Sequence, residues 1–423
     1  MDTSSMPSLR YLRVFETVAR LESVSRASTA IHLSQPAVTQ AIAKLEEEIG
    51  TPLFERRHTG TYLTNAGIIF RRRTQRLFAQ IEEALREFGV DSASPRKSDP
   101  ALEAGKITRT QIRSFAALAR SGSLAQAARA IGISQSSLHR AVRDLEGQLG
   151  RPLYRHTAHG IIATKSGVEL ARRMMLATRE IECAIDELKA ADGEVGGRIA
   201  IGAQLLGSSC LIGSLANKVI SRYPQARFQI VNDSYDSLLN SLRTGTIDYI
   251  VGTLRNPAPM PDVVEEALFS DPYVVAARRG HPLTRLRKVT LEDLSRYRWV
   301  VPLKGSTRRQ AFERLFADAP CLPGIGVETY ALPIIRAILA DSDHVSLLTR
   351  YEIASEDRMG ELTMVRFEPG YASASLGITT RAGWLPTQLQ LGFLALLREH
   401  AHSIAADGMA RRHVPLEVVA LAG

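Results

Sequence analysis

The chain has 423 residues, of which 45% are hydrophobic, so it can form two or three domains with substantial cores. Its formal net charge of +9 suits a polyanionic partner without locating the surface that would bind one. No apolar run approaches the roughly 18 residues of a membrane span. The three cysteines, Cys183, Cys210 and Cys321, lack the close spacing of metal or redox sites. We therefore expect a cytoplasmic protein with no cofactor and no membrane partner.

An internal repeat with a period of 100 residues dominates the first half of the chain. The segment LSQPAVTQAIAKLEEEIGTPLFERRHTG from Leu33 aligns without a gap with ISQSSLHRAVRDLEGQLGRPLYRHTAHG from Ile133. Identical positions include the core candidates Phe15 and Phe115. We interpret the repeat as one structural module that occurs twice.

In the first copy, apolar residues at helical spacing predict two short helices within residues 9–31, the second with Ser23 as its N-cap. Pro36 suits the first turn of a third helix, which extends to residue 49 and stops at Gly50. Residues 53–64 are basic and compatible with β-structure. This order predicts a helix-turn-helix followed by a wing.

A long helix is predicted from residue 64 to residue 88, with an apolar stripe that includes Ile69, Leu77, Ile81 and Leu85. A stripe of this length needs a partner helix, because so small a module cannot bury it alone. We expect the partner in a second protomer, which would make the protein at least a dimer. Packing of the helix against its own module is the alternative.

The second copy predicts the same elements again: helices at 111–120, 123–131 and 135–148, a wing at 153–164 and a long helix at 166–190. The resulting domain prediction is a first module with its long helix (1–88), a flexible linker (89–104), a second module with its long helix (105–192), a further domain (193–403) and a C-terminal tail (404–423).

Strands and helices alternate after the glycine-rich stretch at 193–197. The predicted strands are 198–202, 227–231, 247–252, 273–276, 299–302 and 345–348, and the predicted helices are 209–222, 234–244, 306–316 and 332–339. Such alternation indicates an α/β fold with a mainly parallel sheet and helices on both faces. The segment is long for one sheet, so we expect two lobes with crossovers near Ala276 and Tyr371.

These motifs resemble those of LysR-type transcriptional regulators. Residues 9–90 resemble the family's DNA-binding module in the SQPAV turn, the LFERR wing and the LTNAG start of the long helix. Residues 107–423 resemble a complete second member, with GGRIAIG from Gly196 and GHPL from Gly280 in its effector half. The resemblance implies two winged helix-turn-helix modules and a two-lobed effector domain similar to periplasmic binding proteins. The extra module departs from the family, so the usual tetrameric architecture cannot be copied.

Polar and basic residues at the start of each third helix and on each wing are the candidates for contact with double-stranded DNA. They are Ser34, Gln35, Pro36, Thr39, Gln40, Arg56 and Arg57 in the first copy, and Ser134, Gln135, Ser136, His139, Arg140 and Arg155 in the second. Side chains on the third helix can meet base edges in the major groove, and arginines on the wing suit phosphates. Both copies keep the apolar frame but differ on the surface, so we infer two readers with different preferences. Whether both copies are active stays open.

Hydroxyl and acidic residues that follow predicted strands are the candidates for binding a small effector. They are Ser208, Ser209, Asp233, Ser234, Ser306 and Thr307. Free N–H groups at the start of a helix attract anions, although the same residues also serve as ordinary N-caps. The resemblance places the serine pairs near the cleft between lobes. Arg308 and Arg309 either add charge there or lie on a surface.

The sequence therefore predicts a sequence-specific transcriptional regulator, gated by a small anionic inducer, that forms a homo-oligomer and has RNA polymerase as a candidate partner. An effector-independent DNA-architectural protein is the first alternative. An enzyme or solute-binding protein that retains DNA-binding relics is the second. No catalytic or metal-ligand constellation appears at a defensible spacing, so we expect no enzyme activity.

Overall fold

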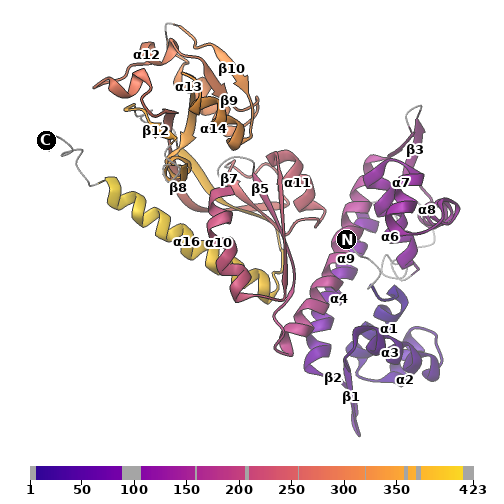
Figure 1. Cartoon of the computed structure of the whole chain (residues 1–423). Coiled ribbons are helices and arrows are strands. Elements are labelled where there is room, and N and C mark those ends of the chain that lie inside the picture. The colour runs from indigo at the N-terminus through magenta and orange to yellow at the C-terminus, as the bar shows by residue number, and fades with distance from the viewer. Residues whose placement is uncertain are drawn as a thin grey trace. The chain divides into compact units, whose positions relative to one another are not determined.

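The computed structural model describes residues 6–87, 106–157, 160–204, 209–255, 257–319, 321–356, 361–367 and 373–412. The chain forms two compact units: Met1–Gly197 with Thr244–Thr246, and Arg198–Arg243 with Ile247–Gly423. The first unit is coloured from indigo to purple in Figure 1, and the second from magenta to yellow. No helix among the described residues is long and apolar enough to cross a membrane.

The first module folds as a helix-turn-helix with a wing, as its residue pattern predicts. Its elements are α1 (Leu9–Leu21), α2 (Val24–Ala30), α3 (Gln35–Ile49), β1 (Phe54–Arg57) and β2 (Gly60–Leu63). The hydroxyls of Ser23 and Ser34 accept backbone hydrogen bonds at the starts of α2 and α3, and Pro36 lies in the first turn of α3. Gly50 ends α3 with a φ of 82°, a left-handed conformation that favours glycine.

The second module repeats this fold. Its elements are α6 (Arg109–Ser121), α7 (Leu124–Ile131), α8 (Gln135–Leu149), β3 (Tyr154–Thr157) and β4 (Gly160–Ala163). Gly67 and Gly167 recur in the two copies for a packing reason. A Cβ atom at either position would lie 2.1 Å from the carbonyl oxygen of Leu53 or Leu153. Glycine thus allows the long helix of each module to start against the residue that precedes its wing.

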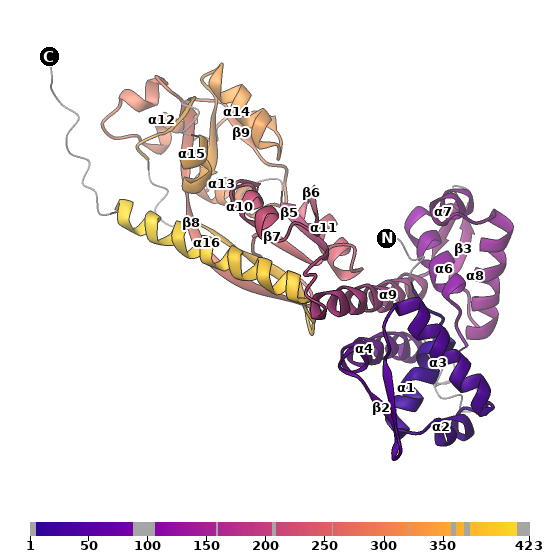
Figure 2. The same cartoon turned by 60° about the horizontal axis from the view of Figure 1, so that its bottom comes forward.

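Each module continues into a long helix, α4 (Asn65–Glu87) in the first and α9 (Lys165–Ala191) in the second. The two helices lie side by side in Figures 1 and 2 and are antiparallel. Arg73, early in α4, contacts Glu187 near the end of α9, whereas the last residue of α4 contacts Arg173, early in α9.

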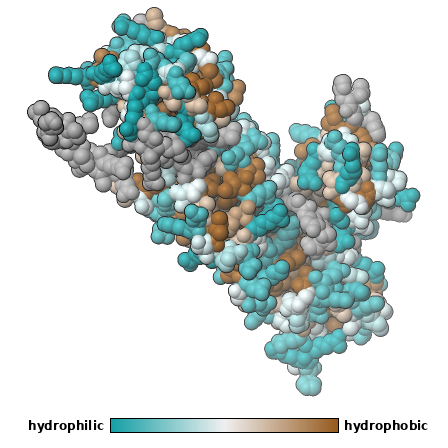
Figure 3. Space-filling model, in the orientation of Figure 1, coloured by the Kyte–Doolittle hydropathy of each residue, from teal (hydrophilic) through white to brown (hydrophobic). Residues whose placement is uncertain are grey.

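The apolar stripe of α4 is buried against α9. Leu77, Ile81 and Leu85 have no exposed surface, and one hydrophobic core cluster extends from Met6 to Leu188 through both modules. The expectation that a second protomer covers this stripe is therefore wrong, because the second copy of the repeat in the same chain covers it. The surface that the first module presents at the lower right of Figure 3 is mostly hydrophilic.

The second unit contains a mixed sheet in which β10-β9-β11-β8-β13-β7-β5-β6 is the strand order and β12 pairs with β8. The strands are β5 (Gly197–Gln204), β6 (Ala226–Asp233), β7 (Tyr249–Thr253), β8 (Val263–Arg278), β9 (Trp299–Val301), β10 (Ile325–Glu328), β11 (Val345–Thr349), β12 (Leu362–Met364) and β13 (Ser373–Arg381). β5 and β7 are parallel, as are β9, β10 and β11. β8 and β13 run antiparallel to their neighbours, so the sheet is mixed and not mainly parallel as predicted.

The long strand β8 divides this unit into two lobes. Its residues up to Pro272 pair with β13, and those from Tyr273 onward pair with β11 and β12. The first crossover thus lies a few residues before Ala276, where the sequence pattern placed it. The return strand β13 starts at Ser373 opposite Pro272. Tyr371, the second predicted crossover, lies outside the described residues.

Helices cover both faces of the sheet, as predicted. They are α10 (Ser209–Arg222), α11 (Tyr235–Arg243), α12 (Leu291–Ser295), α13 (Thr307–Leu315), α14 (Leu332–Ala340), α15 (Arg350–Glu356), α16 (Gln388–Arg412) and a 3-10 turn at Pro282–Arg285. Tyr249 stacks on Phe393 of α16, while the next residue of β7, Ile250, shares a core cluster with Leu238 of α11. Successive strand residues point to opposite faces. Helix α16 extends to Arg412, into the segment predicted as a tail.

Candidate DNA-binding surfaces and ligand pocket

Helix α3 has one buried face and one exposed face. Val38 and Leu45 belong to the buried face, whereas Ser34, Gln35, Pro36 and Gln40 are exposed and Thr39 is half-buried. Ser34 accepts a hydrogen bond from the backbone N–H of Ala37 (3.3 Å). Gln35 donates to the hydroxyl of Ser25 on α2 (3.2 Å). All five candidates on this helix thus lie at or next to its solvent face, where a DNA groove could be read.

The two wing arginines of the first module differ in their contacts. Arg57 forms an ion pair with Glu55 and lies over the ring of Tyr62 at 5.5 Å. Arg56 is exposed and forms no ion pair with any residue that the structure describes. Arg56 is therefore the better placed of the two to meet a phosphate.

In the second module, Ser134 caps α8 by accepting from the backbone N–H of Ser137 (3.1 Å). The other candidates of this module are exposed, except His139, which is half-buried; they are Gln135, Ser136, Arg140 and Arg155. Sequence reasoning missed Arg143, which is exposed one turn after Arg140 on α8. The signal was present in the sequence, because Arg143 replaces Ala43 of the first copy. The second recognition helix thus carries two exposed cations where the first carries Gln40 and Ala43.

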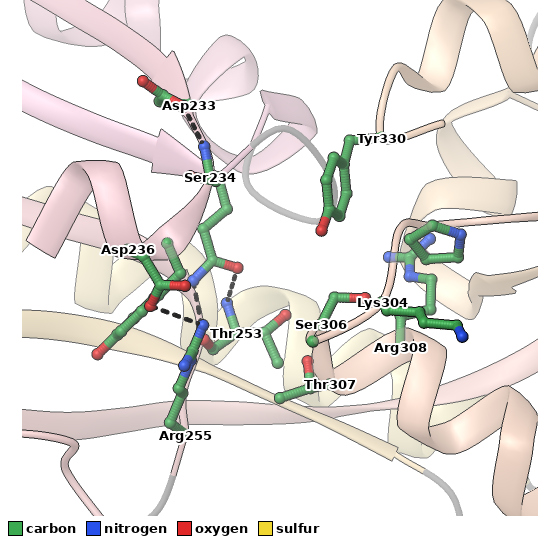
Figure 4. A pocket seen from close by; sticks show the side chains of 14 residues that line it. Asp233, Ser234, Asp236, Thr253, Arg255, Lys304, Ser306, Thr307, Arg308 and Tyr330 are labelled. Atoms are coloured by element: carbon green, nitrogen blue, oxygen red, sulfur yellow. Dashed lines mark hydrogen bonds and ion pairs between the residues drawn. The ribbon is translucent and has the colours of Figure 1, made fainter. Parts of the chain in front are cut away.

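In the second unit, a pocket of about 110 Å³ lies between residues of the two lobes. Its lining comes from the ends of strands and the starts of helices: Gln204, Asp233, Ser234, Tyr235, Asp236, Thr253, Arg255, Pro302, Lys304, Gly305, Ser306, Thr307, Arg308 and Tyr330. In Figure 4, Ser306 and Thr307 approach from the start of α13, and Tyr330 points its hydroxyl toward the same space. Arg255 and Thr253 face them from the first lobe.

The start of α13 presents donors to this pocket. The hydroxyl of Ser306 accepts from the backbone N–H of Arg309 (3.1 Å) and donates to the carbonyl of Leu303 (3.3 Å). Ser306 is thus an N-cap, as expected. Thr307 beside it is the first residue of the helix, where backbone N–H groups lack partners within the helix.

The opposite wall includes the start of α11. The carboxylate of Asp233 accepts hydrogen bonds from the Ser237 hydroxyl and from the backbone N–H of Ser234 (2.6 Å). These bonds lower the pKa of Asp233 below its ordinary value. Asp233 therefore keeps a negative charge next to the pocket, while the hydroxyl of Ser234 caps α11 by accepting from the backbone N–H of Ser237 (3.4 Å). Ser208 lies outside the described residues, and for Ser209 only the backbone position at the start of α10 is described.

Three cations line the pocket, and two of them are already paired. A guanidinium nitrogen of Arg255 lies 3.1 Å from a carboxylate oxygen of Asp236, and the guanidinium group lies over the ring of Tyr235. Arg308 is buried and lies 2.8 Å from Glu352. Lys304 is exposed and forms no ion pair with another residue that the structure describes. Lys304 thus offers a positive charge to a ligand.

Of the two alternatives for Arg308 and Arg309, a surface face is wrong for both, whereas Arg308 does line the pocket, with its charge paired to Glu352. Both are 5% exposed. Arg309 pairs with Glu328 and with Glu313, so its charge is neutralised within the lobe. Sequence reasoning also missed Lys304, Arg255 and Tyr330. Lys304 could have been found, because it follows a predicted strand just before the Ser306 cap.

Matches to known families agree with this architecture. The helix-turn-helix domain described as "Bacterial regulatory helix-turn-helix protein, lysR family" matches residues 9–68 and again 110–168, and the "LysR substrate binding domain" matches residues 192–402. The chain belongs to the LysR family of transcriptional regulators. It is a DNA-binding regulator with an effector-binding domain, and the family is not one of enzymes, which removes the enzyme alternative.

The chain is 33% identical over 396 residues to the HTH-type transcriptional regulator GalR of Pseudomonas putida, covering 93% of this chain and 97% of that protein. The part of this chain outside the alignment is shorter than either module, so the alignment with this relative includes residues of both modules. The SDS degradation transcriptional activation protein of a Pseudomonas species is 29% identical and covers 64% of this chain but 90% of its own length. Full-length OxyR from Pseudomonas aeruginosa has a similar fold, with a TM-score of 0.52, 22% identity and coverage of 69% of this chain and 94% of that one.

Proposed function

We propose that the chain represses or activates transcription in response to a small anionic metabolite that binds in the pocket between the lobes of the second unit. The observation that carries this proposal is Lys304, an exposed cation of the pocket that lies just before the start of α13. It forms no ion pair with a carboxylate in the described part of the chain. A carboxylate placed there would meet the lysine ammonium group and the backbone N–H groups at the start of α13, beside Ser306 and Thr307.

The paired charges of the pocket support an anion over a cation in a second way. Arg255 and Arg308 each already have a carboxylate partner, so a cationic ligand would have to compete with those arginines for Asp236 or Glu352. The remaining lining carboxylate, Asp233, already accepts hydrogen bonds from Ser234 and Ser237 at the start of α11. An anion needs no such exchange at Lys304. Ser234 and Asp233 would then shape the opposite wall, with Asp233 holding α11 in place. Ligand contacts to both lobes would favour a closed lobe angle and so change how the protein bends or spaces its DNA.

Trp299 and Trp384 are the two tryptophans of the chain, and both lie in the second unit. Tryptophan fluorescence during heating therefore reports ligand binding to this unit alone. We would screen short mono- and dicarboxylic acids against their uncharged amides. The acids should raise the fluorescence-detected Tm, and Lys304→Ala and Ser306→Ala should abolish that rise.

Lys288→Ala is the matched control, because Lys288 is an exposed lysine of the same lobe outside the pocket. It should respond as the unaltered protein does. Amides that stabilise the unit as well as acids do, or a normal response of Lys304→Ala, would contradict the anionic ligand. The architectural alternative predicts instead that no small molecule changes the DNA bend.

For the DNA, we propose that the exposed candidates of α3 and α8 read bases, while Arg56, Arg57 and Arg155 on the wings contact phosphates. The exposure of these side chains supports the proposal. Gln suits adenine, and Arg suits guanine. The copies share Gln35 and Gln135 but differ at the next candidates, so we expect Thr39 and Gln40 to prefer a different sequence from His139 and Arg140.

A further inference from the structure

The α4–α9 interface is reciprocal. Arg73 of α4 donates to Glu187 of α9 (3.1 Å), and the equivalent residues with the copies exchanged, Arg173 and Glu87, are joined in the same way (2.9 Å). A second exchange follows the same rule. Arg73 donates to Glu180 (2.8 Å), and Arg173 donates to Gln80, the equivalent of Glu180 (3.3 Å).

Reciprocal contacts of this kind define a twofold relation. In an isologous interface, residue i of one copy meets residue j of the other, and j meets i. Such interfaces join two identical subunits, but here the two copies are parts of one chain. The interface is buried, which supports a permanent pairing of α4 with α9. Arg73 is 1% exposed, and one core cluster contains apolar residues from both long helices.

The twofold relation fixes how the readers are presented. Because α4 and α9 are antiparallel, their N-terminal ends, to which the two helix-turn-helix modules are attached, lie at opposite ends of the helix pair (Figure 1). The 23 residues of α4 correspond to roughly 34 Å at 1.5 Å per residue. Lys165, the first residue of α9, lies eight residues before Arg173, which contacts the end of α4, so the starts of the two helices are roughly 45 Å apart along the pair. This separation is on the scale of one turn of DNA, the spacing at which two related readers meet successive major grooves.

The two readers are nevertheless unlike. Gln40 and Ala43 on α3 correspond to Arg140 and Arg143 on α8. An exposed glutamine and an exposed arginine favour different bases at the same position of a half-site. A twofold arrangement with unlike readers therefore matches an inverted pair of half-sites whose sequences differ.

We infer that a single chain is a complete two-headed DNA reader, and that it recognises two unlike half-sites in inverted orientation about one helical turn apart. The inference rests on the proposed reading of DNA by both modules. Its two parts, pairing within one chain and inverted unlike half-sites, need separate measurements.

Crosslinking tests the pairing in the full chain. Gln80 and Arg173 would be changed to Cys in a background of Cys183→Ala, Cys210→Ser and Cys321→Ser, and treated with a short bismaleimide. Because the effective concentration within a chain is on the order of millimolar, the link within the chain should exceed the link between chains by roughly a thousand-fold at about one micromolar protein. The control pair is Gln80→Cys with Lys189→Cys. Lys189 lies more than four turns after Arg173 on α9, so a short reagent should not link it to position 80 on α4. A predominant link between chains would overturn the inference, and circular dichroism verifies that each variant is folded.

Selection from a random library of DNA duplexes tests the arrangement of the half-sites. The enriched duplexes should contain two unlike half-sites in inverted orientation, and reversing one of them should weaken binding by at least about ten-fold. Direct repeats, identical half-sites or indifference to the reversal would overturn the inference while leaving DNA reading intact. Enrichment of no duplex would instead contradict the proposed function, and the inference with it.

Discussion

Removal of the Arg73 side chain should destabilise the first unit far more than removal of its counterpart Arg173. Arg73 is 1% exposed and holds two carboxylates, those of Glu180 and Glu187, which are 13% and 20% exposed. Burial alone lowers the pKa of Arg73, but its hydrogen bonds to Glu187 and Glu180 outweigh burial and raise this pKa above the ordinary value. The guanidinium is therefore charged at every working pH.

Breaking a fully buried ion pair by removing one partner costs about 3–5 kcal/mol, because the other charge is left uncompensated. Here the two carboxylates keep some access to water, and Arg76 still donates to Glu180 (2.9 Å). We therefore expect Arg73→Met to lower the free energy of unfolding by roughly 2–3 kcal/mol. Arg173 is 19% exposed and its partner Glu87 is 42% exposed, so Arg173→Met should cost about 0.2–1 kcal/mol.

Urea unfolding of the full chain separates the two units. Far-ultraviolet circular dichroism detects helix loss in both, whereas tryptophan fluorescence detects only the second unit. Arg73→Met should shift a dichroism transition to lower urea and leave the fluorescence transition in place. Equal and small shifts for Arg73→Met and Arg173→Met would refute the burial of Arg73 between α4 and α9.

Two further predictions concern pH and salt. Burial raises the pKa of Asp271 to about 6 in the folded protein, against hydrogen bonds from Thr349 and Tyr351, so the folded state holds this proton more tightly than the unfolded chain. This contribution to the free energy of unfolding is full below pH 4 and lost as the pH rises through 6. Between pH 4 and 7, the unfolding free energy detected by fluorescence should therefore fall by roughly 1–3 kcal/mol relative to that of Asp271→Asn. Parallel pH profiles of the two proteins would contradict this prediction. Arg56→Ala should weaken DNA binding for all sequences alike and reduce the slope of log affinity against log salt by about one, whereas an unchanged slope would remove Arg56 from the phosphate contacts.

Local signals in the sequence predicted the modules closely. The caps Ser23 and Ser34, the first-turn Pro36 and the stop at Gly50 act through neighbouring backbone groups, so their effect is visible in a short window of sequence. The strand-end serine Ser306 was found for the same reason, as the start of a helix.

Long-range pairings were the part that sequence reasoning could not supply. The partner of the α4 stripe lies about a hundred residues away in the other copy, and an apolar stripe does not specify which helix covers it. β13 was missed, and with it the mixed sheet, because strand direction depends on where the chain returns. The sequence left open whether Arg308 lies at the cleft or on a surface, because its partner, Glu352, lies 44 residues further on.

Deleting residues 1–104 would be a poor test of the two-reader account, since it also exposes the apolar face of α9, including Met174 and Ile181. Single substitutions avoid this problem. The most direct measurement repeats the duplex selection with Gln35→Ala and with Arg140→Ala. The account predicts that Gln35→Ala relaxes base preference in one half-site and Arg140→Ala in the other. Relaxation of the same half-site by both variants, or of neither half-site by one of them, would contradict the claim that one chain carries two working readers.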